Sequence, residues 1–329
     1  MMKMQTISRR EIAKRSLQLA LAGQVALPSG SAAPTEGLDP VTSWAAIAAC
    51  EFQRFPNHER SPLGGADLVY GKANNIELRL DVVTAGPETE MRPTVLSIHG
   101  GGWVHLMKED TWLYNLPYLA QGMDAVNIEY RLANQSPAPA AVEDCRCALH
   151  WVHEHAAEYG FDKQKLVLAG ESAGGHLALM TGMLNAEAGF DNACAYSNKI
   201  SPVGVSAIVN FCGITDVADL LDGANRRSWA VEWLGANPER ERLARQLSPL
   251  SYVRSGLPPI ISIHGTKDNA VPYEHAVRLH QALEKAGVPN ELVTIPGGGH
   301  GMRGWPRAEG QRAHFRIFRF LKEHGTLSA

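Results

Sequence analysis

A glycine-rich pentapeptide around Ser172 is the segment of this sequence best suited to do chemistry. Residues 170–174 read Gly-Glu-Ser-Ala-Gly, and a G-x-S-x-G pattern is typical of a sharp strand-to-helix turn that presents a serine Oγ as a nucleophile. Small residues are required there, because larger side chains would collide with the neighbouring strand and helix. The apolar run 165–169 reads as the strand and residues 175–180 as the helix. We therefore expect Ser172 to be a nucleophile; the alternative is a plain turn.

Three consecutive glycines upstream of the serine could supply hydrogen-bond donors. Residues 99–103 read His-Gly-Gly-Gly-Trp, directly after the apolar run 94–98. Attack of a serine on an acyl carbonyl creates an oxyanion, which needs preorganised N–H donors, and a backbone without Cβ atoms can approach a substrate closely. The alternatives are a flexible turn or a phosphate-binding loop. A phosphate loop would need a G-K-[ST] ending or G-x-G-x-x-G before a helix, and neither is present.

A serine nucleophile also needs a base, and the base needs an acid that orients it. In this type of architecture the chain order is Ser, Asp or Glu, His. Asp268 follows an expected strand at 259–265, and His300 stands among glycines just after an expected strand at 291–295. We predict that His300 is the base and Asp268 the acid. The nearest rival acid is Asp216, in the loop after the strand that ends at Phe211.

The chain contains thirteen histidines, so position matters more than residue type. His99 and His264 lie beside glycine turns, and we expect them to make structural hydrogen bonds. Five others fall on expected amphipathic helices, where a solvated or half-buried side chain is the usual role: His153, His155, His275, His280 and His324.

Strands and helices alternate along the chain, which predicts a mostly parallel sheet covered on both faces. Residues 75–83 alternate apolar and polar side chains, as in an edge hairpin strand. The helix expected at 307–324 should turn Phe315, Phe318 and Leu321 inward. Residues 217–257 fit the alternation poorly and could form a lid over the site. The other expected strands are 94–98, 124–130, 165–169, 205–211, 259–265 and 291–295, and the other expected helices are 139–159, 175–180 and 272–286.

These motifs resemble the α/β-hydrolase superfamily, and most closely its hormone-sensitive-lipase-like and feruloyl/acetyl-xylan-esterase-like (BD-FAE-type) esterases. The resemblance extends from about residue 65 to the C-terminus. Lipase-like relatives often have aspartate in place of Glu171, and a Tyr-Arg-Leu-Ala-Pro run that Asn134 interrupts here. The segments that carry the resemblance are 99–103, 129–132, 137–144, 170–175, 264–268 and 296–301.

The resemblance implies an α/β-hydrolase fold and a role for each motif. Ser172 would be the nucleophile, His300 the base and Asp268 its orienting acid. The oxyanion hole would be formed by the N–H groups of Gly101, Gly102 and Ala173. Such a site needs neither a metal nor a cofactor.

The implied activity is that of a serine carboxylic-ester hydrolase that works through an acyl-enzyme. The substrate would be a small-molecule or carbohydrate-linked ester, possible examples being acetyl or feruloyl esters. One alternative is an arylformamidase-like amide hydrolase, which shares an H-G-G-x-W loop. Another is a hydrolase-fold binding protein without turnover, which is disfavoured because every triad position is filled.

The first 33 residues differ from the rest and look like a twin-arginine export signal. Arg9 and Arg10 precede the modestly apolar segment 17–27 and then small residues up to Ala33. This predicts a signal peptide at 1–33, a single catalytic domain at 34–329 and a periplasmic or secreted enzyme. The alternative is an amphipathic surface helix on a cytoplasmic enzyme.

Composition argues against a nucleic-acid partner and against a membrane-spanning segment. The 329 residues are 45% hydrophobic and 20% charged, with a net charge of −3. Removal of residues 1–33, with five basic residues and one acidic, would change the charge to −7. An acidic domain without a Lys and Arg cluster argues against nucleic acid as a partner. No apolar run reaches the ~20 residues of a stable membrane span.

Five cysteines leave at least one thiol unpaired. Cys145 and Cys147 are two residues apart on an expected helix, so they point to different faces and should not pair with each other. Without C-x-x-C spacing or neighbouring histidines, a zinc site is not expected.

Overall fold

A computed structural model describes residues 65–328, apart from 74, 87–89, 186–187, 192–193, 195–203 and 303–304. The predicted leader at 1–33 and the predicted domain start at residue 34 lie outside the described residues, as does Cys50. No helix in the part of the chain described here is both long and apolar enough to cross a membrane.

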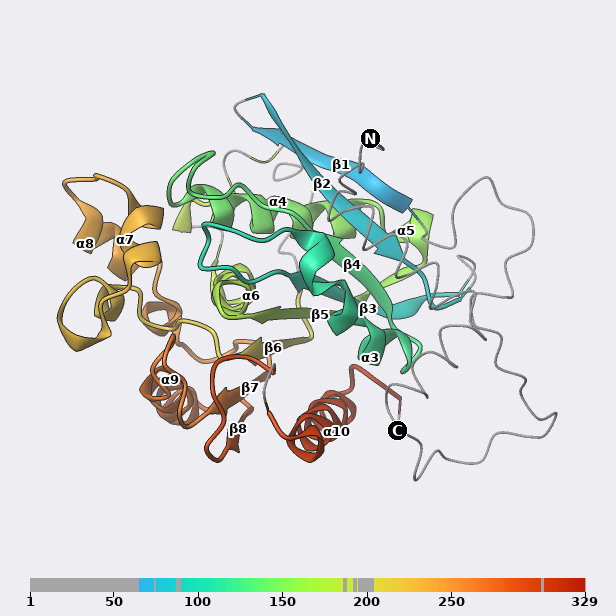
Figure 1. Cartoon of the computed structure of the whole chain (residues 1–329). Coiled ribbons are helices and arrows are strands. Elements are labelled where there is room, and N and C mark those ends of the chain that lie inside the picture. The colour runs from blue at the N-terminus through green and yellow to red at the C-terminus, as the bar shows by residue number, and fades with distance from the viewer. Residues whose placement is uncertain are drawn as a thin grey trace, which may run out of the picture.

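In the described part of the chain an eight-stranded sheet forms the centre, and helices cover both of its faces (Figure 1). Its order is β1-β2-β4-β3-β5-β6-β7-β8. The hairpin β1–β2 is antiparallel and pairs antiparallel with β4, whereas all neighbours from β4 to β8 are parallel. The predicted, mostly parallel sheet is therefore present. The strands are β1 (Gly65–Ala73), β2 (Ile76–Val83), β3 (Arg92–Ile98), β4 (Asp124–Ile128), β5 (Phe161–Glu171), β6 (Ala207–Phe211), β7 (Ile260–Gly265) and β8 (Asn290–Ile295).

The central strands are rich in apolar residues because both of their sides are covered. Every residue of β4, β6 and β7 is buried. Successive side chains alternate between the two faces. On one face Leu96, Leu168 and Ile208 pack beneath α4 (Ala140–Glu154), α6 (Ala173–Met183) and α9 (Glu274–Lys285). On the other, Val95 and Val167 pack against α3 (Leu116–Leu119) and α10 (Arg307–Glu323).

One expected strand has a different place in the sheet, and one expected helix is divided in two. One edge of the sheet is β1, and β2 lies one strand further in, paired on both sides. The prediction that residues 75–83 form the edge strand was therefore wrong, because β1 has an irregular burial pattern that gives no clear alternation. The helix expected at 139–159 is divided at His155 into α4 and α5 (Ala156–Tyr159).

The inward face of α10 was predicted wrongly at Phe315. This side chain is 67% exposed, whereas Ala313, Ile317 and Leu321 are buried. Phe315 lies two residues after Ala313, about 200° around the helix axis, and so on its opposite side. Phe318 is partly buried, as expected.

A buried lysine fixes the segment that follows the glycine loop. Lys108, the first residue of η1 (Lys108–Asn115), holds its Nζ 2.6 Å from Asp81, 3.1 Å from Asp67 and 2.9 Å from Glu109. The Lys108 carbonyl accepts a 2.6 Å hydrogen bond from Asn127 of β4. Removing one partner from such a buried cluster leaves a charge uncompensated, so this contact ties the loop firmly to the hairpin.

Cys147 forms a disulfide with Cys194, 5.2 Å apart between Cα atoms, and joins α4 to the segment after α6. Cys145 is buried and free, so Cys145 and Cys147 do not pair with each other, as predicted. Cys212 is the second free, buried thiol among the described residues.

The segment 217–257 lies between β6 and β7, at the left of Figure 1. It contains η3 (Ala218–Leu220), η4 (Gly223–Asn225), α7 (Ser228–Leu234), α8 (Arg240–Gln246) and η5 (Pro249–Tyr252). Buried Trp233 stacks on Trp103 of the glycine loop at 4.0 Å between ring centroids. That the segment 217–257 acts as a lid stays a prediction.

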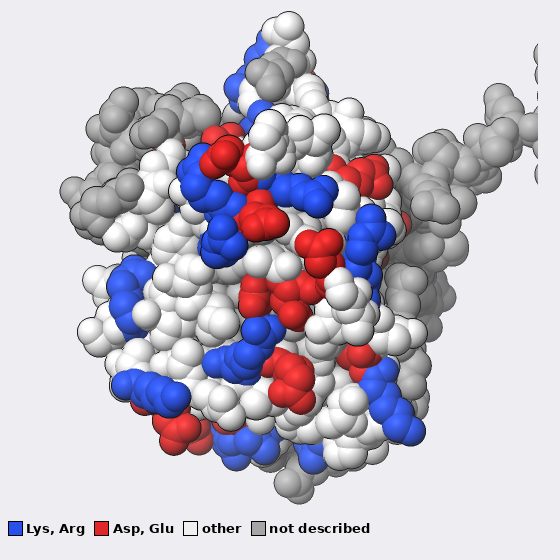
Figure 2. Space-filling model, turned by 90° about the vertical axis from the view of Figure 1, so that its left-hand side faces the viewer, with Lys and Arg blue, Asp and Glu red and all other residues white. Residues whose placement is uncertain are grey.

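Figure 2 shows acidic and basic side chains intermixed on the face with α7, α8 and α9.

Candidate active site

Ser172 sits at a strained turn between β5 and α6. β5 ends at Glu171 and α6 begins at Ala173, and the serine between them has φ 58° and ψ −119°. A Cβ added at Gly170 would overlap the backbone of Gly174, and one at Gly174 would overlap the carbonyl of Ile98. Both glycines of the pentapeptide are therefore sterically required, as the sequence pattern predicts. A positive φ on a residue other than glycine is strained backbone of the kind that clusters at functional sites.

The structure brings the three predicted triad residues together. Ser172 Oγ lies 2.9 Å from His300 Nε2, and His300 Nδ1 lies 2.7 Å from Asp268 Oδ2. A carboxylate only accepts, so Nδ1 carries the proton and a neutral Nε2 accepts from the serine hydroxyl. These residues follow β5, β7 and β8, whose carboxyl ends lie along one edge of the sheet.

Asp268 is held by four donors. Its Oδ1 accepts from the backbone N–H groups of Ala270 at 2.8 Å and Val271 at 2.9 Å. Its Oδ2 accepts from His300, and His264 Nε2 lies 3.3 Å from the same oxygen. Burial alone would raise the pKa of this carboxyl, but the bonds from His264 and His300 outweigh burial and hold the pKa well below its usual range. Asp268 is therefore ionised and fixed in orientation.

His264 is a contact of the acid that the sequence did not reveal. Its Nε2 lies between two acceptors, the Val271 carbonyl at 3.1 Å and Asp268 Oδ2, so this nitrogen carries the proton. Its buried Nδ1 has no hydrogen-bond partner among the described residues, which fits a neutral ring. The predicted structural hydrogen bond is present. The four-residue spacing from His264 to Asp268 is the only local signal of the second contact.

Replacing His264 by leucine should lower kcat about tenfold, because Asp268 loses a donor that fixes its orientation. KM should stay within about twofold. His264→Gln, whose amide N–H can reach the same oxygen, should recover part of the loss. The measurement is steady-state hydrolysis of p-nitrophenyl acetate. In an Asp268→Asn background His264→Leu should have no further effect, and an equal loss in both backgrounds would mean that His264 does not act through the acid.

The predicted oxyanion donors are free to bind a ligand. The N–H groups of Gly101, Gly102 and Ala173 make no hydrogen bond to the described part of the chain. The loop lies against the turn at Ser172, since a Cβ at Gly100 would be 2.8 Å from the Glu171 carbonyl oxygen. Uncommitted donors beside a reactive serine are what an oxyanion hole requires.

Cys212 lies behind the triad. Its Sγ, an Asp268 oxygen and a His300 nitrogen are within 4.8 Å of one another, the one such candidate metal group found among the described residues. Burial raises the pKa of the Cys212 thiol well above its usual value, so the sulfur stays protonated. His300 Nδ1 is already bonded to Asp268. The group therefore fits a hydrogen-bonded triad better than a metal site.

The remaining candidates lie elsewhere. Asp216 is paired with Arg278 at 2.9 Å and is not joined to His300. His99 donates to the neighbouring Gly100 carbonyl, as a structural histidine would. The helix histidines are likewise engaged outside the site: His153 with Gly204, His155 with Trp151, His275 with Asp219, His280 with Asn290 and His324 with Phe320.

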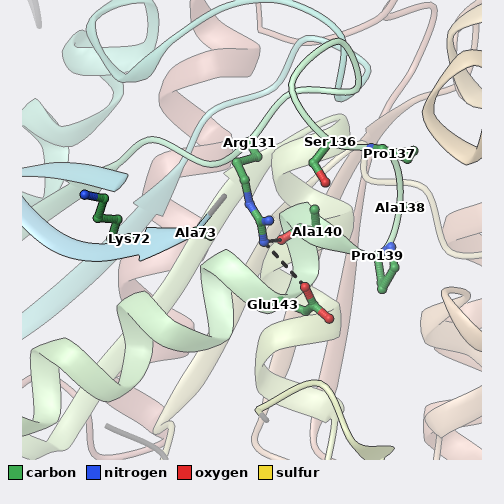
Figure 3. A pocket seen from close by; sticks show the side chains of 9 residues that line it. All are labelled: Lys72, Ala73, Arg131, Ser136, Pro137, Ala138, Pro139, Ala140 and Glu143. Atoms are coloured by element: carbon green, nitrogen blue, oxygen red, sulfur yellow. Dashed lines mark hydrogen bonds and ion pairs between the residues drawn. The ribbon is translucent and has the colours of Figure 1, made fainter. Parts of the chain in front are cut away.

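An open cleft of about 500 Å³ lies beside the start of α4, away from Ser172 and its partners (Figure 3). Its cation Arg131 is already bound by Asp144 at 2.7 Å and by Glu143 at 3.4 Å. None of the predicted catalytic or oxyanion residues lines this cleft.

Comparison with known proteins agrees with this geometry. The sequence model of the BD-FAE family matches residues 80–283, more than half of the chain. The chain belongs to the BD-FAE family. Esterase 2 of Thermogutta terrifontis is similar to this BD-FAE chain in structure, with 31% identity, a TM-score of 0.68 and coverage of 80% of this chain and 94% of that one. The same esterase phosphorylated by paraoxon matches with 30% identity and a TM-score of 0.68, over 83% of this chain and 100% of that one. The α/β-hydrolase fold class is thereby confirmed.

Curated relatives of this BD-FAE chain are also esterases. Esterase LipC of Mycobacterium tuberculosis is 29% identical over 226 residues, 65% of this chain and 54% of LipC. Carboxylesterase NlhH of the same species is 31% identical over 217 residues, 64% of this chain and 66% of NlhH. The chain spans about half the length of the first curated relatives that it matches.

Proposed function

We propose that this protein is a serine carboxylic-ester hydrolase that works through an acyl-enzyme. The observation that carries the proposal is the continuous hydrogen-bonded chain from Ser172 through His300 to Asp268, beside backbone donors with no partner in the described chain. The esterase names of its relatives support the same reaction class.

In the acylation half, Ser172 Oγ attacks the ester carbonyl carbon while its proton passes to His300 Nε2. Negative charge develops on the carbonyl oxygen, where the N–H groups of Gly101, Gly102 and Ala173 stabilise it. The ester C–O bond then breaks, and His300 returns the proton to the departing alkoxide. Asp268 stays ionised and stabilises the imidazolium.

In the deacylation half, water attacks the acyl-enzyme as His300 takes one of its protons. The second tetrahedral intermediate collapses, the bond to Ser172 Oγ breaks, and the serine regains a proton from His300. The products are a carboxylic acid and an alcohol, and the enzyme returns to its starting state.

For the substrate, we propose acetyl or feruloyl esters of carbohydrates. Membership of the BD-FAE family and the predicted export signal support this choice. An arylformamidase-like activity uses the same nucleophile on a formamide, because the triad fixes the reaction type and not the acyl group. A binding protein without turnover would not need the serine, the base and the acid all within hydrogen-bonding distance.

An ester panel on the purified protein tests these proposals. p-Nitrophenyl acetate reports esterase activity, methyl ferulate and acetylated xylan report the proposed substrates, and N-formylkynurenine reports the alternative. Higher kcat/KM on the formamide than on every ester would favour the arylformamidase. No turnover on any of them, with no phosphorylation by paraoxon, would favour the binding protein.

We also propose that the enzyme is exported through its twin-arginine leader. Replacing Arg9 and Arg10 by lysine should trap the precursor in the cytoplasm, because the export receptor reads the arginine pair and not the charge alone. N-terminal sequencing of wild-type protein from the periplasm should find a start near Ala33 or Pro34. Active enzyme in the cytoplasm with an intact Met1 would show that the leader is a surface helix.

A further inference from the structure

One of the three oxyanion donors is oriented by side chains, and the other two by backbone. We propose that Tyr130 and His99 are positioning residues that fix the direction of the Gly101 N–H toward the oxyanion. This inference rests on the proposed function, since it assigns residues that support the same oxyanion hole.

The carbonyl of Gly100 is held from two sides. The Tyr130 hydroxyl lies 3.0 Å from this oxygen and 3.1 Å from the His99 carbonyl oxygen, and His99 Nδ1 lies 2.8 Å from the Gly100 oxygen. Both groups must donate, because a carbonyl oxygen only accepts. The hydroxyl has one proton, which the two carbonyls share.

The Gly100 carbonyl and the Gly101 N–H belong to one planar peptide unit. In a trans peptide these two groups point in opposite directions. Fixing the carbonyl against Tyr130 and His99 therefore fixes the N–H on the other side of the loop. Gly101 has φ 101°, a value that glycine adopts easily because it has no Cβ. Without the bonds from Tyr130 and His99, the peptide plane between Gly100 and Gly101 would therefore be free to rotate.

The other two donors depend on backbone contacts. The Gly101 carbonyl, which shares a peptide with the Gly102 N–H, accepts from Val104 and His105 at 3.1 Å each. The Ser172 carbonyl, which shares a peptide with the Ala173 N–H, accepts from His176 at 3.0 Å in the first turn of α6. A side-chain substitution can therefore loosen the Gly101 donor alone.

Tyr130 and His99 are built as a rigid pair. Both are buried, and their rings stack at 4.1 Å between centroids with 12° between planes. Burial lowers the pKa of His99 to about 4, so the ring stays neutral near pH 7 with its proton on Nδ1. Neither ring carries out a step of the proposed reaction, so their effect passes through Gly101.

The test is Tyr130→Phe, which keeps the ring and removes only the hydroxyl. We expect kcat to fall about tenfold with KM nearly unchanged, less than the ~10²–10³ for removal of a whole oxyanion donor. A second readout compares the inactivation rates with paraoxon and with its P=S analogue. Sulfur accepts hydrogen bonds weakly, so the variant should slow the P=O reagent more than the P=S reagent.

Tyr70→Phe is the matched control. The Tyr70 hydroxyl is also buried and donates to a backbone carbonyl, that of Glu129 at 2.6 Å. Both variants should lower the melting temperature by similar amounts, and only Tyr130→Phe should lower the P=O to P=S rate ratio. His99→Leu removes the other donor to the Gly100 carbonyl and should lower the P=O to P=S rate ratio in the same way. The proposal can therefore still be tested if one of the two variants folds poorly.

An unchanged rate ratio in a folded Tyr130→Phe or His99→Leu protein would overturn the inference, as would an equal change in Tyr70→Phe. Failure of the proposed function is a separate outcome, because the wild-type protein itself would then neither hydrolyse esters nor react with paraoxon.

Discussion

Replacement of Ser172 by alanine should lower kcat by at least about 10³ and leave the melting temperature close to that of the wild type. The change removes Oγ, the only atom that forms the covalent acyl-enzyme. Residual activity remains because the oxyanion donors and the substrate contacts are untouched. Alanine keeps the Cβ that already fits the turn, so the strained backbone should persist.

Two measurements test this prediction: turnover of the ester and covalent labelling of the serine by paraoxon. Paraoxon should add one diethylphosphoryl group to the wild-type protein, as it phosphorylates the Thermogutta terrifontis esterase, and none to Ser172→Ala. Ser251→Ala is a matched control, because Ser251 is exposed and donates to the Arg245 carbonyl on the segment after β6. Activity of Ser172→Ala within tenfold of the wild type, or a label mapped to another residue, would refute the assignment of the nucleophile.

The central part of the fold could be predicted because its signals are local. Strands β3 to β8 each contain a short, mainly apolar run, and all of them except β4 end at or just before a glycine, so these local signals located them to within a few residues. The pentapeptide around Ser172 and the glycine loop at 99–103 are steric requirements written directly in the sequence. The order of serine, acid and base then selected Asp268 and His300 from many aspartates and histidines.

The features that escaped prediction depend on contacts between distant segments. Lys108 stands in a charged stretch that reads as exposed, yet it is buried because Asp67 and Asp81 come from another hairpin. Phe315 was assigned inward by its type, and the packing of α10 on the sheet turns it to solvent. The hydroxyl of Tyr130 reaches carbonyls thirty residues away, which no local pattern encodes. The sequence thus predicted which groups react, and the structure shows which contacts hold those groups in place.

Replacement of Asp268 by asparagine should lower kcat by about 10⁴ with little change in KM. Each carboxylate oxygen of Asp268 accepts from two donors, so the NH₂ group of an asparagine would face an N–H group at either position. When the NH₂ group takes the position of Oδ2, it relieves the clash with His300 by donating to Nδ1, and the imidazole proton then moves to Nε2. A protonated Nε2 cannot accept the serine proton, and the nucleophile stays inactive.

The same substitution should change how stability depends on pH. The pKa of Asp268 is depressed in the folded protein, so its contribution to stability is present above its unfolded pKa and is lost as the pH falls through the folded value. Melting temperatures of Asp268→Asn should therefore fall less steeply on acidification than those of the wild type. Identical slopes would mean that the folded carboxyl titrates normally.

Asp216→Asn provides the matched control for the acid. Asp216 lies after β6, is partly exposed, and pairs with Arg278 at 2.9 Å instead of with a histidine of the triad. An exposed pair of this kind contributes about 0–1 kcal/mol, so kcat of this variant should stay within about twofold of the wild type. The pair of variants separates the two acids by kcat on p-nitrophenyl acetate. An inactive Asp216→Asn together with an active Asp268→Asn would show that the acid is Asp216, in the loop after β6, and would overturn the triad proposed here.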